Sequence, residues 1–176
     1  MLKILAIVAG VLVLVIAGVV IYASTKPDTF RVSRTTSINA APEKIAPYVN
    51  DLRRAVEWSP WEKMDPGMSR SYSGPDSGVG QFYSWDSKSA GAGSQKIVES
   101  TLSRVLIELN FTRPFKSENM AEFRMEPKGG ATEVTWSMWG PSPLYAKVMH
   151  LFFNVDKEIG GAFAQGMADL KTVVEK

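Results

Sequence analysis

The side chains that most often perform covalent catalysis are scarce in this chain. Among 176 residues there is no cysteine and one histidine, His150. Thiol nucleophiles are therefore excluded, and a serine–histidine–acid triad would have to use His150. This residue is two positions from both Val148 and Phe152 of an apolar stripe, so at about 100° per residue we expect it on the solvent side of a helix. The sequence favours no nucleophilic mechanism.

Metal and acid–base chemistry would need clustered ligands or paired carboxylates. No group of His, Cys and carboxylate residues has metal-ligand spacing, so we expect no metal and no cofactor. The glutamates of the predicted strands mostly alternate with apolar residues, so we expect them to face solvent: Glu108, Glu118, Glu122, Glu126 and Glu133. Arg113, before Pro114, is either solvated or placed to meet an anionic ligand at a cavity mouth. The glycine-rich stretches 74–80 and 89–94 are typical of hairpin turns, since neither joins a strand to a helix as a phosphate loop does.

The N-terminus is apolar enough to cross a membrane. No charged residue occurs from Ile4 to Thr25, and residues 4–23 as a helix would span roughly 30 Å, the thickness of the hydrocarbon core. A cleaved signal peptide is the alternative, but its apolar region is usually about 7–15 residues long, and Ile21 suits a cleavage site at Ala23 poorly. We therefore expect a transmembrane helix at residues 1–25 and one soluble domain at residues 26–176.

Charge gives some information on sidedness and partners. The charges flanking the helix nearly balance, but a large domain after a short basic N-terminus usually crosses the membrane, so we expect the domain outside the cytoplasm. The chain has 20 Lys and Arg, so without Lys3 the rest has 19 against 18 Asp and Glu. A nearly neutral domain without a basic stripe argues against nucleic acid as a partner. The sequence does not determine the oligomeric state.

Hydrophobic periodicity predicts the elements of the domain. Alternation over residues 30–39 predicts a strand, and residues 43–56 predict two short helices that end by Ser59, before Pro60. Six further strands are predicted at 68–73, 78–87, 94–101, 104–111, 119–126 and 132–139. Apolar residues then recur every three or four positions from Leu144 to Val174, which predicts a long helix that Gly160-Gly161 kinks or divides.

This order predicts an α+β fold in which a seven-stranded antiparallel sheet curls around the long C-terminal helix. Alternation assigns to the inward faces several apolar strand residues, Val79 among them, that would meet the helix stripe. Plain core packing is the alternative to a ligand cavity there. The residues that we expect to line a cavity are Trp61, Tyr83, Trp85, Leu109, Phe111, Phe123, Met125, Trp136, Met138, Phe152, Phe163 and Met167.

The stretch WSPW, residues 58–61, stands where neither a helix nor a strand is expected to run smoothly. Pro60 would stiffen a corner at an open end of the sheet. We expect Trp58 to have a structural role, closing the fold at the cavity mouth, and Trp61 to form part of the rim of that mouth.

Six stretches together resemble the START-like (SRPBCC) superfamily, in particular its polyketide cyclase/dehydrase group. They are INAAPEKIAPYVNDLRR (38–54), EWSPWEKMDPGM (57–68), YSGPDSGVGQFYSWDS (72–87), FTRPF (111–115), GGATEVTWSMWG (129–140) and FAQGMADLK (163–171). The resemblance implies a helix-grip fold, here after one membrane helix, and a cavity for a hydrophobic or amphipathic small molecule. It implies no particular reaction, because the group has no shared catalytic motif.

The sequence thus favours a membrane-anchored binding protein for such a molecule, with a lipid as one candidate, over an enzyme. Two alternatives stay open. One is a cyclase- or dehydratase-like enzyme that uses a cavity Tyr or Glu as acid or base. The other is a protein-interaction module with a filled core.

Overall fold

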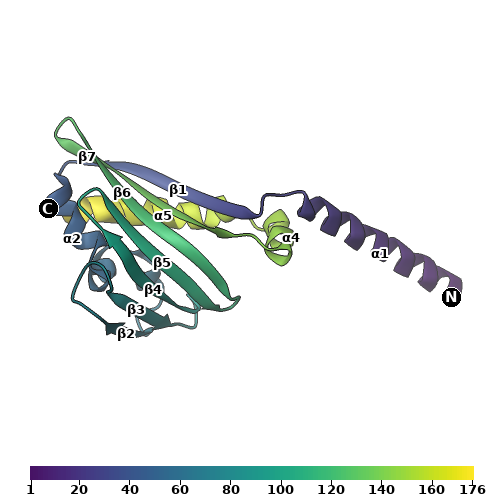
Figure 1. Cartoon of the computed structure of the whole chain (residues 1–176). Helices are drawn as coiled ribbons and strands as arrows, with labels where there is room; N and C mark the ends of the chain where they lie inside the picture. Colours follow the sequence, from purple (N-terminus) through teal and green to yellow (C-terminus); the bar gives the residue numbers. More distant parts are fainter.

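The computed structural model describes residues 1–176, apart from the side chain of Leu2. One helix projects from a domain in which a curled sheet lies against a long helix (Figure 1). The elements are α1 (Leu2–Ser24), β1 (Thr29–Ile38), α2 (Pro42–Val49), the 3-10 helix η1 (Leu52–Glu57), α3 (Pro60–Met64), β2 (Ser69–Ser73), β3 (Phe82–Asp86), β4 (Ala92–Ser100), β5 (Arg104–Arg113), β6 (Ser117–Lys128), β7 (Ala131–Pro141), α4 (Leu144–Phe152) and α5 (Val155–Val174).

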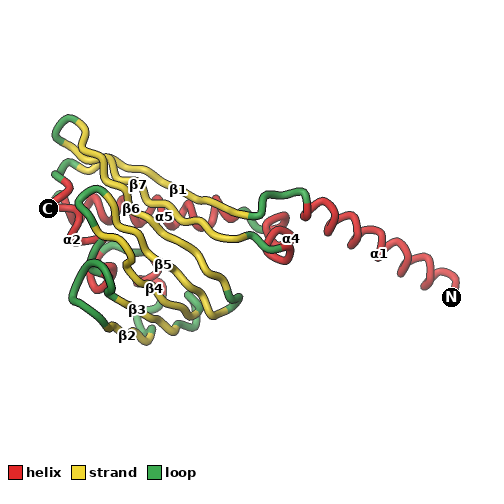
Figure 2. Tube along the Cα trace, viewed as in Figure 1, coloured by secondary structure: helices red, strands yellow, loops and turns green.

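The seven strands form one antiparallel sheet in the order β1-β7-β6-β5-β4-β3-β2. Strands β2 to β7 pair with their neighbours in sequence, and β1 returns to pair with β7 from Thr29 opposite Pro141 to Ile38 opposite Thr132. The strands twist as extended L-residue chains do, and the sheet wraps along one side of α5 (Figure 2). The predicted α+β helix-grip arrangement is confirmed.

The apolar stripe of α5 forms the centre of the core. Phe163, Met167, Leu170 and Val174 recur at helical spacing, and none is more than 2% exposed. They belong to one cluster with the inward-facing residues of the strands. Burying each such side chain contributes roughly 1.5–3 kcal/mol. Hydrophobic contact therefore provides most of the free energy that holds the sheet against α5.

The C-terminal apolar run is two helices, but they do not divide at the glycines as predicted. The break is at Asn154, whose side-chain oxygen accepts a hydrogen bond from the backbone N–H of Lys157 at 2.9 Å and caps α5. Gly160 and Gly161 lie inside α5. At Gly160 the guanidinium of Arg34 occupies the space that a Cβ would take, so a side chain there would have to displace it.

The stretch WSPW includes a helix start, where the sequence had predicted an irregular corner. Ser59 is extended, and Pro60 occupies the first position of α3. Proline suits that position because its fixed φ is helical and its missing N–H would have no helical partner. Trp61 and Glu62 are therefore held on a short helix that faces the sheet.

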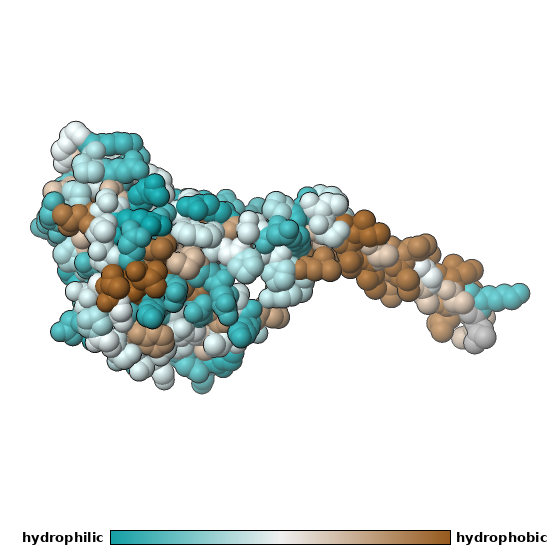
Figure 3. Space-filling view, in the orientation of Figure 1, coloured by the Kyte–Doolittle hydropathy of each residue, from teal (hydrophilic) through white to brown (hydrophobic). Residues whose placement is uncertain are grey.

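The helix α1 is long and apolar enough to span a membrane, and its surface is almost entirely hydrophobic (Figure 3). It is not joined to the domain by a free tether. Ala23, near its end, is fully buried, and α1 contacts α4. The carbonyl of Asp28 accepts the N–H of Ser142 at 2.6 Å, and its carboxylate accepts Lys147 Nζ at 2.6 Å. These contacts hold the end of α1 beside α4.

Candidate ligand-binding cavity

A cavity of about 360 Å³ lies between the concave face of the sheet and the helices η1, α3 and α5. Most of its wall is aromatic or aliphatic, with contributions from β3, β5, β6 and β7 on one side and from Phe163 and Ile159 of α5 on the other. The exposed lining residues are Met64, Ser89 and Pro114. They come from the end of α3, the β3–β4 turn and the β5–β6 hairpin, so the cavity opens between these segments.

The structure brings together nine of the twelve residues assigned to the cavity. Strand alternation places the strand residues on the concave face, and α3 and α5 supply the others. The nine lining residues are Trp61, Tyr83, Trp85, Leu109, Phe111, Phe123, Trp136, Met138 and Phe163.

Three assignments are wrong as lining residues. Phe152 is 72% exposed, because the chain breaks at Asn154 and α4 does not continue the stripe of α5 toward the sheet. Met125 and Met167 are buried and fill the core without bordering the cavity. Val79, expected on the same face as Tyr83, is exposed.

The exposure of Val79 has a local cause. It stands between Gly78 and Gly80, which both have positive φ, in the turn that precedes β3. The strand begins only at Phe82, so alternation within β3 does not reach Val79.

Trp136 of β7 is the centre of an aromatic cluster in the wall. Its ring stacks on Phe163 with centroids 4.0 Å apart and on Phe123 at 5.0 Å. Trp58 and Trp61 approach it edge-on, at 5.2 and 5.4 Å. Stacked and edge-on aromatic contacts add roughly 0.5–1.5 kcal/mol each beyond the area that they bury.

The two tryptophans of WSPW, Trp58 and Trp61, both lie against Trp136 in the wall of the cavity. Trp58 is buried, and its indole N–H donates to the carbonyl of Tyr48 at 2.9 Å, which ties the end of η1 to α2. Trp61 is half-buried and packs edge-on against Phe163 at 5.7 Å. Both line the cavity, and Trp58 is the more buried of the two.

The cavity also contains a charged group that sequence reasoning missed. Glu62 of α3 is 8% exposed and borders the cavity. One carboxylate oxygen accepts the hydroxyl of Tyr83 at 2.6 Å, and the other accepts Nε of Arg70 at 2.7 Å. The only sequence signal was its place beside Trp61, and a five-residue helix is too short to show a periodicity that would mark Glu62 as buried.

This group has defined chemical properties. Burial raises the pKa of Tyr83, and the hydrogen bond and negative charge of Glu62 raise it further. Tyr83 therefore stays a neutral hydroxyl near pH 7 and cannot act as a base or nucleophile there. The carboxylate of Glu62, paired with one guanidinium, has lone pairs that can accept a hydrogen bond from a ligand hydroxyl or amine.

The other residues considered for chemistry lie outside the cavity. His150 is half-buried, with its ring edge-on to Phe30 at 6.1 Å, and burial lowers its pKa. It is thus less exposed than predicted. Arg113 pairs with Asp86 and does not line the cavity, although Pro114 does. No cluster of three His, Cys, Asp or Glu residues with metal-site geometry occurs among the described side chains.

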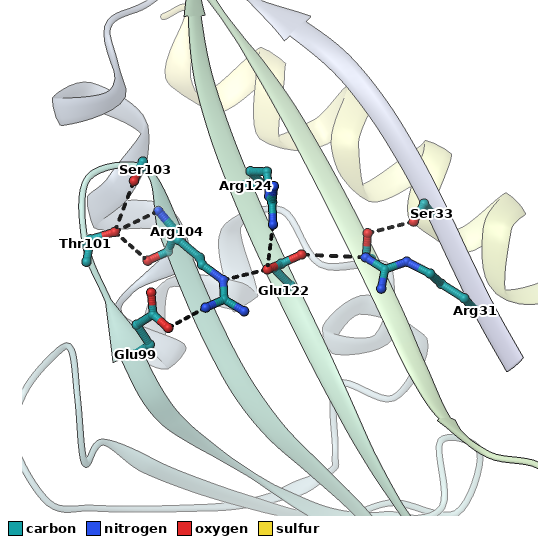
Figure 4. Close-up of polar contacts among 9 residues, drawn as sticks. Arg31, Ser33, Glu99, Thr101, Ser103, Arg104, Glu122 and Arg124 are labelled. Carbon is teal, nitrogen blue, oxygen red and sulfur yellow. Dashed lines mark hydrogen bonds and ion pairs between the residues drawn. The ribbon is translucent and has the colours of Figure 1, made fainter. Parts of the chain in front are cut away.

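A second buried carboxylate lies on the opposite face of the sheet. Glu122 of β6 is 4% exposed, contrary to the expectation that it faces solvent freely. Arg104 donates to it at 2.6 Å, and guanidinium nitrogens of Arg124 and Arg31 lie 3.5 and 3.6 Å from its oxygens. Figure 4 shows the three arginines converging from β5, β6 and β1. They cover the carboxylate and account for its burial.

The pKa of Glu122 results from opposing effects. Burial raises it, but the hydrogen bond from Arg104 and the charges of Arg124 and Arg104 together lower it below its usual value. Glu122 is therefore an ionised carboxylate in a closed network. Because its neighbours Ala121 and Phe123 line the cavity, alternation directs Glu122 to the outer face.

Comparisons with known proteins agree with this fold. Residues 29–175 match the family described as polyketide cyclase / dehydrase and lipid transport. A solved protein from Thermobifida fusca is 18% identical with a TM-score of 0.61, covering 82% of this chain and 92% of its own. The Chromobacterium violaceum protein CV1439 is 16% identical with a TM-score of 0.55, covering 86% and 99%. DynU16, a protein in the dynemicin biosynthetic locus, is 16% identical with a TM-score of 0.57, covering 86% and 48%.

At these identities the solved structures show a common fold alone, and no curated protein sequence matches the chain. The family match carries more weight, because it begins at the first residue of β1 and ends one residue after α5. The chain therefore belongs to the polyketide cyclase/dehydrase and lipid transport family.

Proposed function

We propose that this protein binds a hydrophobic or amphipathic small molecule, with lipids as the leading candidates, in the cavity between the sheet and α5. The observation that carries the proposal is a cavity of about 360 Å³ with a mainly aromatic and aliphatic wall. Pockets for drug-sized ligands span roughly 300–1,000 Å³ and have walls of this kind with few polar groups. The lipid-transport part of the family description supports the same class of ligand.

The wall indicates how such a ligand would be oriented. Its apolar part would lie against the rings of Trp136, Phe123 and Phe163, where burial from water provides most of the affinity. A polar end that can donate a hydrogen bond would lie toward Glu62, whose carboxylate is the buried charge bordering the cavity. An amphipathic molecule with a hydroxyl or amine satisfies both requirements.

The proposal includes the membrane. Residues 4–23 cross the bilayer once, residues 1–25 form the anchor and residues 26–176 form the binding domain. The length and apolar surface of α1 support this division. We place the domain on the extracytoplasmic side, since a large domain after a short basic N-terminus usually crosses the membrane.

Native mass spectrometry of the full-length protein in lipid nanodiscs tests the proposal. We expect an additional mass that remains on the released protein and disappears on denaturation. Ala121 lines the cavity, so Ala121→Leu fills part of it and is expected to remove most of the additional mass. Ala164→Leu, an identical change at an exposed position of α5, is the control and should retain it. A wild-type protein that carries no ligand after incubation with membrane lipids contradicts the proposal and favours the interaction module.

The hydrogen-bonded pair of Glu62 and Tyr83 supports a second candidate, a cyclase- or dehydratase-like enzyme. In that function Glu62 would exchange a proton with the substrate, and Tyr83 would donate a hydrogen bond. Incubating the retained ligand with wild-type protein and with Glu62→Gln distinguishes the functions. A change in the ligand's mass or structure that needs Glu62 indicates an enzyme, and an unchanged ligand indicates binding alone.

A further inference from the structure

The helix α4 exposes its apolar side and buries its charge. Lys147 is 7% exposed and pairs with Asp28, whereas Tyr145 and Phe152 are 49% and 72% exposed. Seven residues make nearly two helical turns, so Tyr145 and Phe152 lie on the same face. A surface helix of a soluble domain normally has the opposite arrangement, with charged residues outward. The outer face of α4 is therefore suited to an apolar environment.

The hairpin between β5 and β6 extends this face. Phe115 at its tip is 53% exposed, and its ring lies 6.3 Å from that of Tyr145. The hydroxyl of Tyr145 donates to the carbonyl of Lys116 at 3.3 Å. We call the exposed group formed by Phe115, Leu144, Tyr145, Phe152 and Phe153 the α4 patch; each of its members is at least 46% exposed.

The junction with α1 determines what environment the α4 patch meets. α1 contacts α4, Ala23 near the end of α1 is buried, and Asp28 is hydrogen-bonded to Lys147 and Ser142. The α4 patch therefore lies where the apolar helix ends and the domain begins. At this end of α1, Lys26 Nζ donates a hydrogen bond to the hydroxyl of Tyr22 at 2.8 Å. Tyrosine and lysine are typical of the boundary between hydrocarbon and water.

We propose that α4 and the tip of the β5–β6 hairpin lie in the headgroup–acyl boundary of the bilayer that α1 crosses. The inference rests on the membrane anchor of the proposed function. Aromatic side chains such as Phe152 and Phe153 then enter the boundary region, and Lys116 beside Phe115 reaches the headgroups. Because α4 contacts the apolar helix α1, a lipid surface is favoured over a partner protein as the occupant of the α4 patch.

This placement has a consequence for the cavity. Pro114 is an exposed residue of the cavity wall and the immediate neighbour of Phe115. Docking of Phe115 into the boundary region therefore brings the mouth of the cavity close to the bilayer. Exposing an apolar ligand to water costs free energy in proportion to its apolar area. With the mouth close to the bilayer, such a ligand could move between the bilayer and the cavity with little exposure to water.

Depth-dependent fluorescence quenching tests the inference in the full-length protein in liposomes. The chain has no cysteine, so Phe115→Cys and Phe153→Cys each allow one environment-sensitive label. Leu102→Cys is the matched control, because Leu102 is 54% exposed and its turn is at the other end of β5. Ten residues of strand separate the two ends by roughly 30 Å. We expect lipids with a nitroxide near the headgroup to quench labels at 115 and 153 several-fold more than the label at 102.

Flotation of the same liposomes separates failure of the inference from failure of the anchor. If the protein floats with the liposomes but labels at 115 and 153 are quenched no more than at 102, the anchor stands and the inference is wrong. Equal strong quenching at all three positions also overturns it, because the contact is then not confined to the α4 patch. If the protein does not float, the anchor and the inference both fail, while ligand binding is judged by mass spectrometry.

Discussion

Glu62 and Glu122 are both buried carboxylates, and they lie on opposite sides of the same curled sheet. Glu122, on the outer face, is near three guanidinium groups, whereas Glu62, on the concave side, is paired with Arg70 and the neutral hydroxyl of Tyr83. Only Glu62 borders the cavity. The outer network satisfies its own charge, so it is best explained as part of the sheet's stability. The inner group is less completely compensated and has space beside it, which makes it the better candidate for contact with a ligand.

The same contrast extends to the aromatic residues of β7. Trp136 points inward and contacts Phe163, Phe123, Trp58 and Trp61. Trp139, three residues later and on the other face, is half-buried and lies under the guanidinium of Arg31 at 4.5 Å. The tryptophan on the concave face therefore packs within an aromatic cluster, whereas the tryptophan on the outer face packs against a cation.

Trp136→Ala is expected to give the largest effect. Large-to-small changes at buried aromatic positions usually cost about 3–5 kcal/mol, because contacts are lost and a void remains. Trp139→Ala on the outer face should cost less, about 1–2 kcal/mol, because Trp139 is only half-buried and its contact with Arg31 is a cation–π contact of modest value. Urea denaturation of both variants measures the difference. Equal losses would show that the concave wall is no more important for stability than the outer face.

Glu122→Gln tests the outer network through its pH dependence. The pKa of Glu122 is lower in the folded protein than its ordinary value of 4.5, so ionised Glu122 adds stability above that value and loses it as the pH falls through the folded pKa. We expect the variant to be less stable than wild type by about 1.5–3 kcal/mol near pH 7, as for a lost hydrogen bond to a charged group. The difference should shrink below pH 4.5.

Denaturant titrations at several pH values measure this change. Glu108→Gln, at an exposed position of β5, is the control and should alter stability by only a few tenths of a kcal/mol. A constant gap between wild type and Glu122→Gln from neutral to acidic pH would mean that the lost contact does not depend on the charge of Glu122.

Periodicity predicted the inner face better than the outer one. Alternation placed Trp136, Phe123 and Leu109 correctly because each lies within a continuous strand that the core forces into one register. It placed Glu122 on the correct face, but the arginines that bury it come from three strands, and single-sequence patterns do not show such pairings. The direction of a side chain was predictable, and its surroundings were not.

The errors at the cavity have related causes. Phe152 continues the apolar stripe in sequence, but the cap at Asn154 breaks the helix and turns Phe152 to the surface. Glu62 belongs to a helix of five residues, which is too short for a periodic signal. In both cases a local backbone feature, a cap or a proline start, decided the position of a side chain that periodicity alone could not place.

The smallest expected effect concerns the helix that the sheet grips. A Cβ added at Gly161 of α5 would point into open space, so Gly161→Ala should stabilise the protein by about 0.5–1 kcal/mol, the helix preference of alanine over glycine. Gly160 faces the sheet edge, where Arg34 donates to the carbonyl of Asp156 at 3.0 Å and to its carboxylate. A methyl group at residue 160 would displace the Arg34 guanidinium, so Gly160→Ala should lose those bonds and gain no net stability. Thermal denaturation of the two variants compares adjacent positions of one helix. Equal stabilisation would show that the contact of Arg34 with α5 contributes nothing, whereas the expected difference would show that the hydrogen bonds from Arg34 to Asp156 depend on the space that glycine leaves at residue 160.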